Sequence, residues 1–513
     1  MSEISVNSFL LGSWQESQIS ERRFESPIDD TKLFTVNKTD VPTEDILQFS
    51  RKQGIKNLQE LNFHDRAKIL KKVGLLLDNV KEELYQLSYH TGATRKDSYL
   101  DLDGGIGTLL VMASKARKEM DESFIHLDGD IENISRKGTF LGQHIFSPLQ
   151  GVAVQINAFN FPIWGMLEKI AVNLMAGVPA IVKPATITCF LTEMMVREII
   201  STNILPKGSI QLICGSANGV LDHISCEDIV TFTGSASTGR MLKAHQKIID
   251  EAVPFNMEAD SLNASILGQD AVPGTEEFEL YIKEVQKEMT IKAGQKCTAV
   301  RRIIVPDNLI DDVQKALINR LSKIIIGDPS IEGVNMGSLA GSDQVIEVSD
   351  KVKELSNSQS ILYGDLEEFD VVGADKNRGA FISPILFLNE KPFEKKDCHK
   401  IEAFGPVSTI IPYKNLDEAI ELSRMGKGSL VCSIITADDS IARNFVIKSA
   451  SMHGRILVLN KDCAKESTGH GSPMPLLTHG GPGRAGGGEE MGGVRGIMHY
   501  LQRTAIQGHP TTL

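Results

Sequence analysis

Apolar residues along this chain follow helical spacing in some segments and short unbroken runs in others. Residues 42–122 show the helical spacing, and the run FHDRAKILKKVGLLLDNVKEELYQLSYHTG stops at Gly92, as helices often do. Strands and helices that alternate predict a parallel sheet covered on both faces. The predicted strands are 151–158, 178–184, 209–215 and 228–235, with helices over 164–177 and 192–203.

A second alternating block extends over roughly residues 259–474 and contains the strand-like runs RRIIVP, VSTIIPY and GSLVCSIIT. Residues 138–148 predict a hairpin or an extended arm. The segment 466–496 is rich in glycine and proline, a composition often found in disordered chain. The sequence IMHYLQRTAIQ after it predicts that the chain packs again beyond that segment.

Composition narrows the class of protein. A chain of 513 residues needs two or more domains, and a net charge of −12 argues against a nucleic-acid partner. The seven cysteines form no CxxC pair, which favours neither a metal site nor a disulfide framework and suggests a reducing compartment. No signal peptide or apolar run of about 18 residues is present, so we expect a cytoplasmic protein without a membrane partner.

Two residues could carry covalent chemistry. Cys297 lies in IKAGQKCTAVRR beside Lys296, Arg301 and Arg302, and positive charge favours a reactive thiolate. Glu258 lies among apolar and small residues, where a carboxylate with a raised pKa can act as a general base. Taken singly, a buried structural cysteine and a capping or ion-paired glutamate are the commoner interpretations.

Two further segments are typical of strand ends that bind ligands. Asn160 follows a strand in INAFNFPIWG and could donate a hydrogen bond to an oxyanion, although asparagine is also common in turns. The loop FTGSASTG spaces Gly234 and Gly239 so that the backbone can approach a pyrophosphate at a helix N-terminus. Lys183, in KPAT one strand earlier, could contact a ribose or phosphate.

The order Asn160, Lys183, the 234–239 loop, Glu258, Cys297 and EAFGPV (402–407) is more specific than any one motif. In this order the chain resembles the aldehyde dehydrogenase superfamily over essentially its whole length. The resemblance implies catalytic roles for Cys297, Glu258, Asn160 and Lys169. It also implies cofactor contacts by Lys183, Ala185, Thr186, Phe232, Gly234, Ser235, Gly239, Glu402 and Phe404.

The resemblance implies an α/β aldehyde dehydrogenase fold. A Rossmann-like parallel-sheet cofactor domain would comprise residues 1–130 and 149–257, and an α/β catalytic domain residues 258–474. A small β oligomerisation arm and the C-terminal tail would comprise 131–148 and 475–513. Family members pair through such an arm, so a homodimer or a homotetramer is expected.

The resemblance also implies a mechanism. The Cys297 thiolate attacks an aldehyde, Asn160 and the Cys297 backbone N–H stabilise the oxyanion, and hydride transfer leaves a thioester. Glu258 then activates the water that releases the acid. Lys169 is similar to a lysine that assists proton relay, but a solvated surface lysine is an open alternative.

The cofactor is argued from Thr186. Members that prefer NAD often carry a glutamate at this position, and its carboxylate would repel a 2′-phosphate, whereas threonine would not. We therefore expect NADP, with NAD as the weaker alternative.

The segments NMEADSLN and HGSPMPLLTHGGPGRAGGGEEMGGVRG narrow the resemblance. They are similar to the semialdehyde dehydrogenase domain of the ring-opening enzyme of bacterial phenylacetate degradation and to the dehydroadipyl-CoA semialdehyde dehydrogenases of benzoate degradation. A CoA-linked unsaturated semialdehyde is the implied substrate, and no hydratase activity is expected from this chain. The alternatives are a general dehydrogenase of free aldehydes, a CoA-acylating dehydrogenase, and a paralogue without catalysis.

Overall fold

A computed structural model describes residues 3–17, 19–217 and 219–511 of the chain. Residues 1–2, 18, 218 and 512–513, which fall in the predicted segments 1–130, 149–257 and 475–513, lie outside the described residues. Within the described ranges, no helix is long and apolar enough to cross a lipid bilayer.

The first large sheet has seven strands in the order β12-β11-β8-β9-β10-β2-β3, and its five strands from β12 to β10 run parallel. Neighbouring residues of β9 alternate between two cores, with Val182 packing on one face and Ile181 on the other, so helices cover both faces as predicted. The strands are β2 Phe9–Leu10, β3 Ser13–Trp14, β8 Ala153–Ile156, β9 Ala180–Lys183, β10 Ile210–Leu212, β11 Ile229–Thr233 and β12 Phe255–Glu258.

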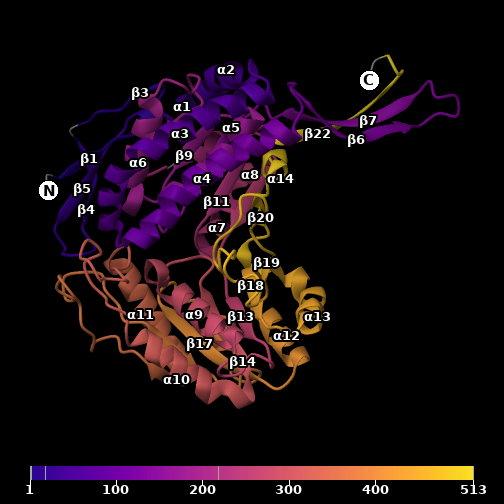
Figure 1. The fold of residues 1–513 in the computed structure, drawn as a ribbon. Coiled ribbons are helices and arrows are strands. Elements are labelled where there is room, and N and C mark those ends of the chain that lie inside the picture. The colour runs from indigo at the N-terminus through magenta and orange to yellow at the C-terminus, as the bar shows by residue number, and fades with distance from the viewer. Residues whose placement is uncertain (1–2, 18, 218, 512–513) are drawn as a thin grey trace.

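Helices from both the N-terminal region and the strand crossovers pack around this sheet (Figure 1). The predicted helical region 42–122 is confirmed, and Gly92 ends its first long helix in the left-handed region at φ 75°. The helices are α1 Thr43–Phe49, a π-helix at Ser50–Ile55, α2 Lys56–Gln59, α3 Phe63–Ser88, α4 Arg95–Glu119, α5 Pro162–Ala176, α6 Cys189–Ser201, α7 Ala236–Lys243 and α8 Gln246–Asp250.

The second large sheet has the order β15-β16-β17-β14-β13-β18-β19 and is parallel except at β15. In β14, Ile303 packs under α9 and α10 whereas Ile304 packs under α12 and α13. The strands are β13 Asn263–Leu267, β14 Val300–Pro306, β15 Ser360–Tyr363, β16 Ile385–Leu388, β17 Val407–Tyr413, β18 Ser429–Ile435 and β19 His453–Leu459. The helices are α9 Glu276–Thr290, α10 Ile310–Leu321, α11 Ser342–Ser356, α12 Leu416–Arg424 and α13 Asp439–Ser449.

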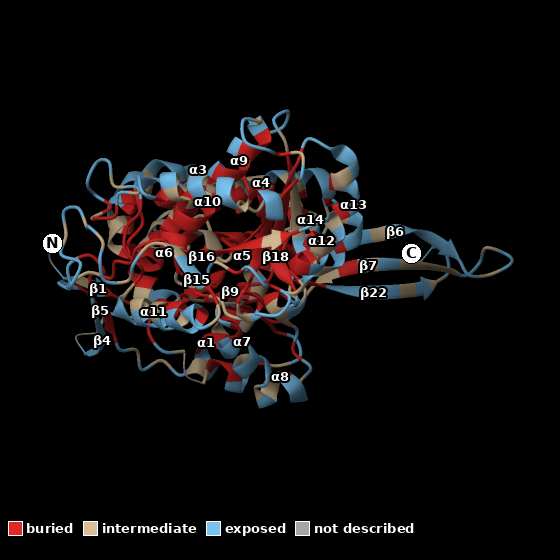
Figure 2. Ribbon diagram, turned by 90° about the horizontal axis from the view of Figure 1, so that it is seen from below, coloured by how far each residue is buried: buried red, intermediate tan, exposed pale blue. Residues whose placement is uncertain are grey.

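A three-stranded antiparallel sheet projects from the body of the molecule (Figures 1 and 2). Its strands are β6 His126–Asn133, β7 Leu141–Pro148 and β22 Leu501–Gly508. The predicted arm around 138–148 is confirmed as a strand, and the residues after the glycine-rich segment do pack again, because β22 pairs with β7 along its whole length. This sheet is called the arm below.

The glycine-rich segment before β22 forms defined structure, because it carries β20 Thr478–His479 paired with β21 Glu490–Met491 and then helix α14 Val494–Met498. At the other end of the chain, β1 Ile4–Val6, β4 Ser20–Glu25 and β5 Lys32–Asn37 make a small sheet of their own.

Candidate active site

The parallel register of the first sheet brings the predicted motifs to one edge. Lys183 at the end of β9 lies opposite Ile156 at the end of β8, and Glu258 at the end of β12 lies opposite Thr233 at the end of β11. Carboxyl ends of parallel strands are where α/β sheets bind ligands. Asn160 follows β8 directly, so three motifs that are far apart in the sequence share this edge.

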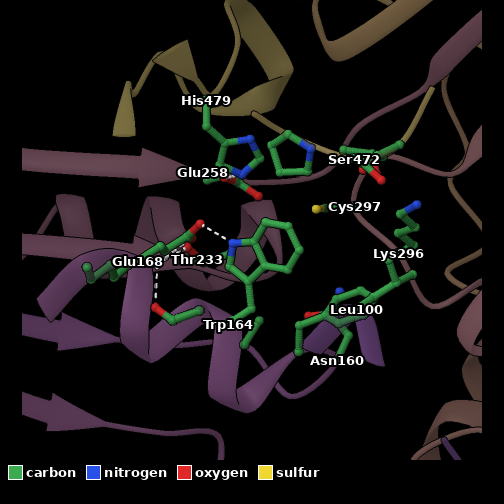
Figure 3. Close-up of a pocket in the computed structure, with 17 residues that line it drawn as sticks. Leu100, Asn160, Trp164, Glu168, Thr233, Glu258, Lys296, Cys297, Ser472 and His479 are labelled. Atoms are coloured by element: carbon green, nitrogen blue, oxygen red, sulfur yellow. Dashed lines mark hydrogen bonds and ion pairs between the residues drawn. The ribbon is translucent and has the colours of Figure 1, made fainter. Parts of the chain in front are cut away.

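One pocket of about 70 Å³ gathers all four predicted catalytic residues, Cys297, Glu258, Asn160 and Lys169 (Figure 3). It lies where the edge of the first sheet meets the loop before β14. The other lining residues are Leu100, Ala158, Phe161, Trp164, Gly165, Glu168, Thr233, Lys296, Thr298, Gly471, Ser472, Pro473 and His479.

Cys297 is a free, partly buried cysteine held by a fixed backbone. The Asn263 side-chain amide donates hydrogen bonds to the carbonyls of Cys297 at 2.8 Å and Ala299 at 3.0 Å. Burial and the neighbouring Glu258 carboxylate raise the pKa of the thiol well above its usual value. The thiol is therefore protonated in this state.

The expectation that basic neighbours favour the thiolate holds for Lys296, whose charge lowers the pKa of Cys297, but burial and Glu258 outweigh this effect in this state. Lys296 is tied to Glu288 at 3.0 Å, and Arg302 donates to three backbone carbonyls in the core. Arg301 donates to the Gly405 and Gly294 carbonyls. Lys296, Arg301 and Arg302 are close to Cys297 in the sequence, but in the fold each of them is bound to other groups.

Glu258 lies at the end of β12 and is buried against His479, whose Nε2 is 2.6 Å from Oε2 (Figure 3). Burial alone would raise the pKa of this carboxyl, but His479 and Lys169 outweigh it and bring the pKa to about 2. The prediction of a raised pKa for Glu258 is therefore wrong. The pKa of His479 is raised in return, against its burial, by the Glu258 charge.

Lys169 lies inside the protein with 1% of its side chain exposed, so the alternative of a surface lysine is wrong. Its Nζ donates to Thr233 Oγ1 at 2.9 Å and lies 3.2 Å from Glu490 and 3.6 Å from Glu168. Burial opposes the charge on Lys169, but the carboxylates outweigh it and raise its pKa. Trp164 Nε1 donates to Glu168 at 2.8 Å and orients that carboxyl.

Asn160 is nearly buried, and its side chain makes no hydrogen bond to another described residue. The amide is therefore available to a ligand oxygen in the pocket that it lines with Cys297. The next residues begin α5, whose first N–H groups at Ile163 and Trp164 donate to the buried Asp101 carboxylate at 3.1 and 2.7 Å. Asp101 thus fixes the turn that carries Asn160.

The predicted adenosine contacts lie together after β9. Lys183 Nζ donates to the Pro184 carbonyl at 2.6 Å, and burial lowers the pKa of this lysine. Ala185 precedes the short turn that begins at Thr186, whose hydroxyl is 3.5 Å from the Gly215 carbonyl. Glu21 lies nearby on β4 and accepts the Ser216 N–H at 3.0 Å.

The 232–239 loop enters α7 as the sequence predicts. Ser235 caps the helix by accepting the Thr238 N–H at 3.4 Å. A Cβ on Gly234 would lie 2.7 Å from the Phe232 ring, and one on Gly239 would lie 2.4 Å from Met257. Only glycine therefore keeps the loop this close to the sheet.

Glu402 and Phe404 approach the same edge from the second sheet. Glu402 Oε2 accepts the Ser261 N–H at 2.9 Å, whereas its buried Oε1 has no hydrogen-bond partner among the described residues. Burial raises the pKa of Glu402 to about 7, although Arg301 at 3.6 Å opposes this. The Phe404 ring packs edge-on against Phe159, beside Asn160, with centroids 5.9 Å apart.

Sequence reasoning missed His479, Glu490 and Glu168. The first two lie in the glycine-rich segment, whose composition hid the fact that β20 and β21 pack against the pocket. Glu168 stands beside Lys169 in the otherwise apolar helix GMLEKIAVNLMAG. Two adjacent charges in such a helix are a readable signal of a buried ion pair.

Known proteins match this arrangement over nearly the whole chain. Residues 14–506 match the aldehyde dehydrogenase family. A 3,4-dehydroadipyl-CoA semialdehyde dehydrogenase from Aromatoleum evansii is 37% identical over 480 residues, which cover 93% of each chain. Protein MaoC of Klebsiella aerogenes is 48% identical over 179 residues, 35% of this chain and 52% of that protein.

The fold itself has close structural neighbours. Betaine aldehyde dehydrogenase from Staphylococcus aureus, in a crystal structure with NAD+, covers 99% of this chain and 95% of its own, with a TM-score of 0.84 and 23% identity. The predicted α/β aldehyde dehydrogenase fold is confirmed. By its sequence, its fold and the motifs gathered at one sheet edge, the chain belongs to the aldehyde dehydrogenase family.

Proposed function

We propose that this NAD(P)-dependent aldehyde dehydrogenase oxidises a CoA-linked unsaturated semialdehyde to the carboxylic acid during bacterial degradation of aromatic compounds, by the benzoate or the phenylacetate type of route. The observation that carries the substrate class is the 37% identity over 93% of the chain to a 3,4-dehydroadipyl-CoA semialdehyde dehydrogenase. The name of Protein MaoC, part of which is similar to this chain, states no substrate. We propose a cytoplasmic location.

In the proposed first step, Cys297 Sγ bonds to the aldehyde carbon while its proton passes to the adjacent Glu258 carboxylate. The C=O π electrons move to oxygen, where the Asn160 amide and the Cys297 backbone N–H stabilise the oxyanion. A protonated thiol beside an ionised carboxylate is the starting arrangement for this transfer. The opposite pKa shifts of the two groups make the transfer uphill by itself, so it has to be coupled to formation of the C–S bond and stabilisation of the oxyanion.

The residues at the sheet edge fit a nicotinamide cofactor. Glu402 Oε1, which lies 3.6 Å from Arg301 Nε and has no hydrogen-bond partner among the described residues, can accept from a ribose hydroxyl, and the loop from Phe232 to Gly239 would lie against the pyrophosphate. Bound there, NAD(P) would take the hydride from the carbon attached to Cys297. We propose NADP over NAD because Thr186 adds no carboxylate at the adenosine ribose, with Lys183 and Ala185 beside it.

Before the proposed last step, Glu258 gives up the proton that it took from Cys297 and is ionised again. It then takes a proton from water as the water oxygen bonds to the thioester carbon. The C–S bond breaks, the Cys297 sulfur leaves and takes this proton from Glu258, and the acid is released, so that the thiol and the carboxylate are restored. His479 positions the Glu258 carboxylate for this step. Lys169, between Thr233 and Glu490, would pass the proton away from the pocket.

The proposed activity is tested with purified protein, NADP and a panel of aldehydes that includes hexanal and the CoA thioester of 6-oxohexanoate. We expect higher kcat/KM for the CoA-linked aldehyde, and loss of at least about 10³-fold of activity in Cys297→Ala. Cys463→Ala, which removes an exposed cysteine, is the matched control. Equal kcat/KM for both aldehydes would contradict the substrate class, and an active Cys297→Ala would contradict the thioester.

A further inference from the structure

We propose that a basic groove beside the catalytic pocket binds the phosphorylated adenosine end of a CoA-linked aldehyde, an inference that rests on the proposed function. The groove lies between α4, α9 and α10 and has a volume of about 1040 Å³. The side chains that define it here are Arg95, Lys96, Tyr99, Leu100, Glu279, Lys283, Lys287, Arg320 and Lys323.

The groove adjoins the catalytic pocket at one residue, Leu100. Leu100 lines both of them, and Lys96 lies one turn earlier on the same side of α4. A second connection comes from α9, because Lys287 packs against Gly469, two residues before the Gly471–Ser472 stretch that lines the pocket. A ligand whose aldehyde reaches Cys297 would pass Leu100 to place its other end in the groove.

The charge of the groove is opposite to that of the chain. Six basic and two acidic side chains line it, an excess of four positive charges in a protein of net charge −12. One of the two acids, Asp97, is buried and accepts from Thr94. Among the described residues, Lys96, Lys283 and Lys323 have no carboxylate within 4 Å, so these ammonium groups are open to an anionic ligand.

An aromatic ring lies among these charges. Tyr99 is 59% exposed on α4, three and four residues after Lys96 and Arg95, and therefore on their side of the helix. An exposed ring flanked by cations suits a nucleobase with phosphates attached. Aldehydes without such a group would leave the groove unused.

CoA fits these features better than a second dinucleotide does. CoA carries a pyrophosphate and a 3′-phosphate on adenosine, joined to its thioester by a long flexible arm. That arm lets the aldehyde end occupy a narrow pocket while the nucleotide lies outside it. The predicted cofactor residues, from Lys183 to Phe404, do not line the groove, so the two nucleotides would not compete.

The test reverses charge in the groove. Lys283→Glu/Lys323→Glu is compared with Lys137→Glu, an exposed lysine between β6 and β7 on the arm. We expect the double variant to lower the ratio of kcat/KM for 6-oxohexanoyl-CoA over hexanal by about tenfold, through KM, and the control to leave the ratio unchanged. Added salt should lower the wild-type ratio in the same direction.

Free CoA provides a readout that does not depend on turnover of the CoA-linked aldehyde. In wild type it should inhibit hexanal oxidation competitively with hexanal but not with NADP, and more strongly than dephospho-CoA. The double variant should lose most of that difference.

The outcomes separate the two proposals. A wild-type preference for the CoA-linked aldehyde that survives charge reversal overturns the groove and leaves the proposed substrate standing. Competitive CoA inhibition with equal kcat/KM for both aldehydes overturns the substrate and leaves the groove standing. The absence of both preference and inhibition overturns both.

Discussion

At the scale of single residues, the pair Glu258–His479 decides how the site titrates. A carboxylate held at a pKa near 2 stays ionised through the whole working range, although so low a pKa also makes it a weak base. The adjacent thiol has the opposite shift and stays protonated until an aldehyde arrives. Before the aldehyde binds, the proton is therefore on the Cys297 sulfur and the Glu258 carboxylate is ionised.

Replacing His479 by Gln removes the charge that stabilises ionised Glu258. Burial then dominates, so the pKa of Glu258 should rise and the acid limb of the kcat/KM–pH profile should move up by at least about one pH unit. His144→Gln, on the exposed arm, is the control. An unchanged acid limb in His479→Gln would mean that the ion pair does not set the ionisation of Glu258.

The same pair links pH to folding. Because the folded-state pKa of Glu258 lies below its ordinary value of 4.5, its contribution to stability is present above pH 4.5 and is lost as the pH falls toward 2. His479 has a raised pKa, so its contribution is present below pH 6.5 and is lost as the pH rises through its folded-state pKa. Thermal melts of wild type and His479→Gln should therefore differ most between the folded-state pKa values of Glu258 and His479, and should converge both below the first and above the second.

The proposed preference for NADP over NAD also depends on a single residue, Thr186. In Thr186→Glu a carboxylate would face the 2′-position of the adenosine ribose, so the ratio of kcat/KM for NADP over NAD should fall by at least about tenfold. Ser201→Glu adds the same charge at the exposed end of α6 and should not change the ratio. A wild-type preference for NAD would contradict the choice of NADP.

At the scale of elements, α5 and β21 are joined by buried charge. Lys169 on α5 is ion-paired with Glu490 on β21, 321 positions later in the chain, and both side chains are buried. The contact fixes the glycine-rich segment against the pocket, so that β20 can present His479. A segment with little side-chain volume is thereby given one defined position.

Lys169→Met leaves Glu168 and Glu490 buried without their cation, which should lower the free energy of unfolding by about 3–5 kcal/mol. Lys169→Met/Glu490→Gln should recover part of that loss. Lys448→Met breaks the exposed pair with Asp417 and should cost less than about 1 kcal/mol. Urea titration measures all three, and equal costs for the two single variants would show that burial of the Lys169 pair has no consequence.

Part of the fold and of the site could be predicted from the sequence. Alternating strands and helices predict the parallel sheet whose edge holds Asn160 and Glu258, whereas the resemblance, through the order of the motifs, adds Cys297 to them. The pKa of Glu258 could not be predicted, because His479 reaches it from 221 positions away through a strand pair only two residues long. Short segments without periodicity carry no local signal of burial. The predicted domain boundaries stay a prediction.

At the scale of the whole molecule, we propose that the arm joins subunits into a homodimer or homotetramer. The arm leaves β6 and β22 as unpaired sheet edges far from the body (Figure 2). On β6, Leu127 and Ile131 are 48% and 52% exposed, and apolar side chains beside an open edge favour pairing with another chain.

Lysine at both β6 positions should weaken such an assembly. Leu127→Lys/Ile131→Lys places two charges on the surface that a partner would cover, so sedimentation velocity at micromolar concentration should show a smaller species than wild type. Ile447→Lys, at a residue 81% exposed on α13, makes the same change away from the arm and should leave the sedimentation coefficient unchanged. If wild type sediments as a monomer, or if the arm variant keeps the wild-type size, these residues do not hold subunits together. Because the arm carries no residue of the catalytic pocket, hexanal oxidation by a variant that has dissociated would show whether the subunit alone forms a working site.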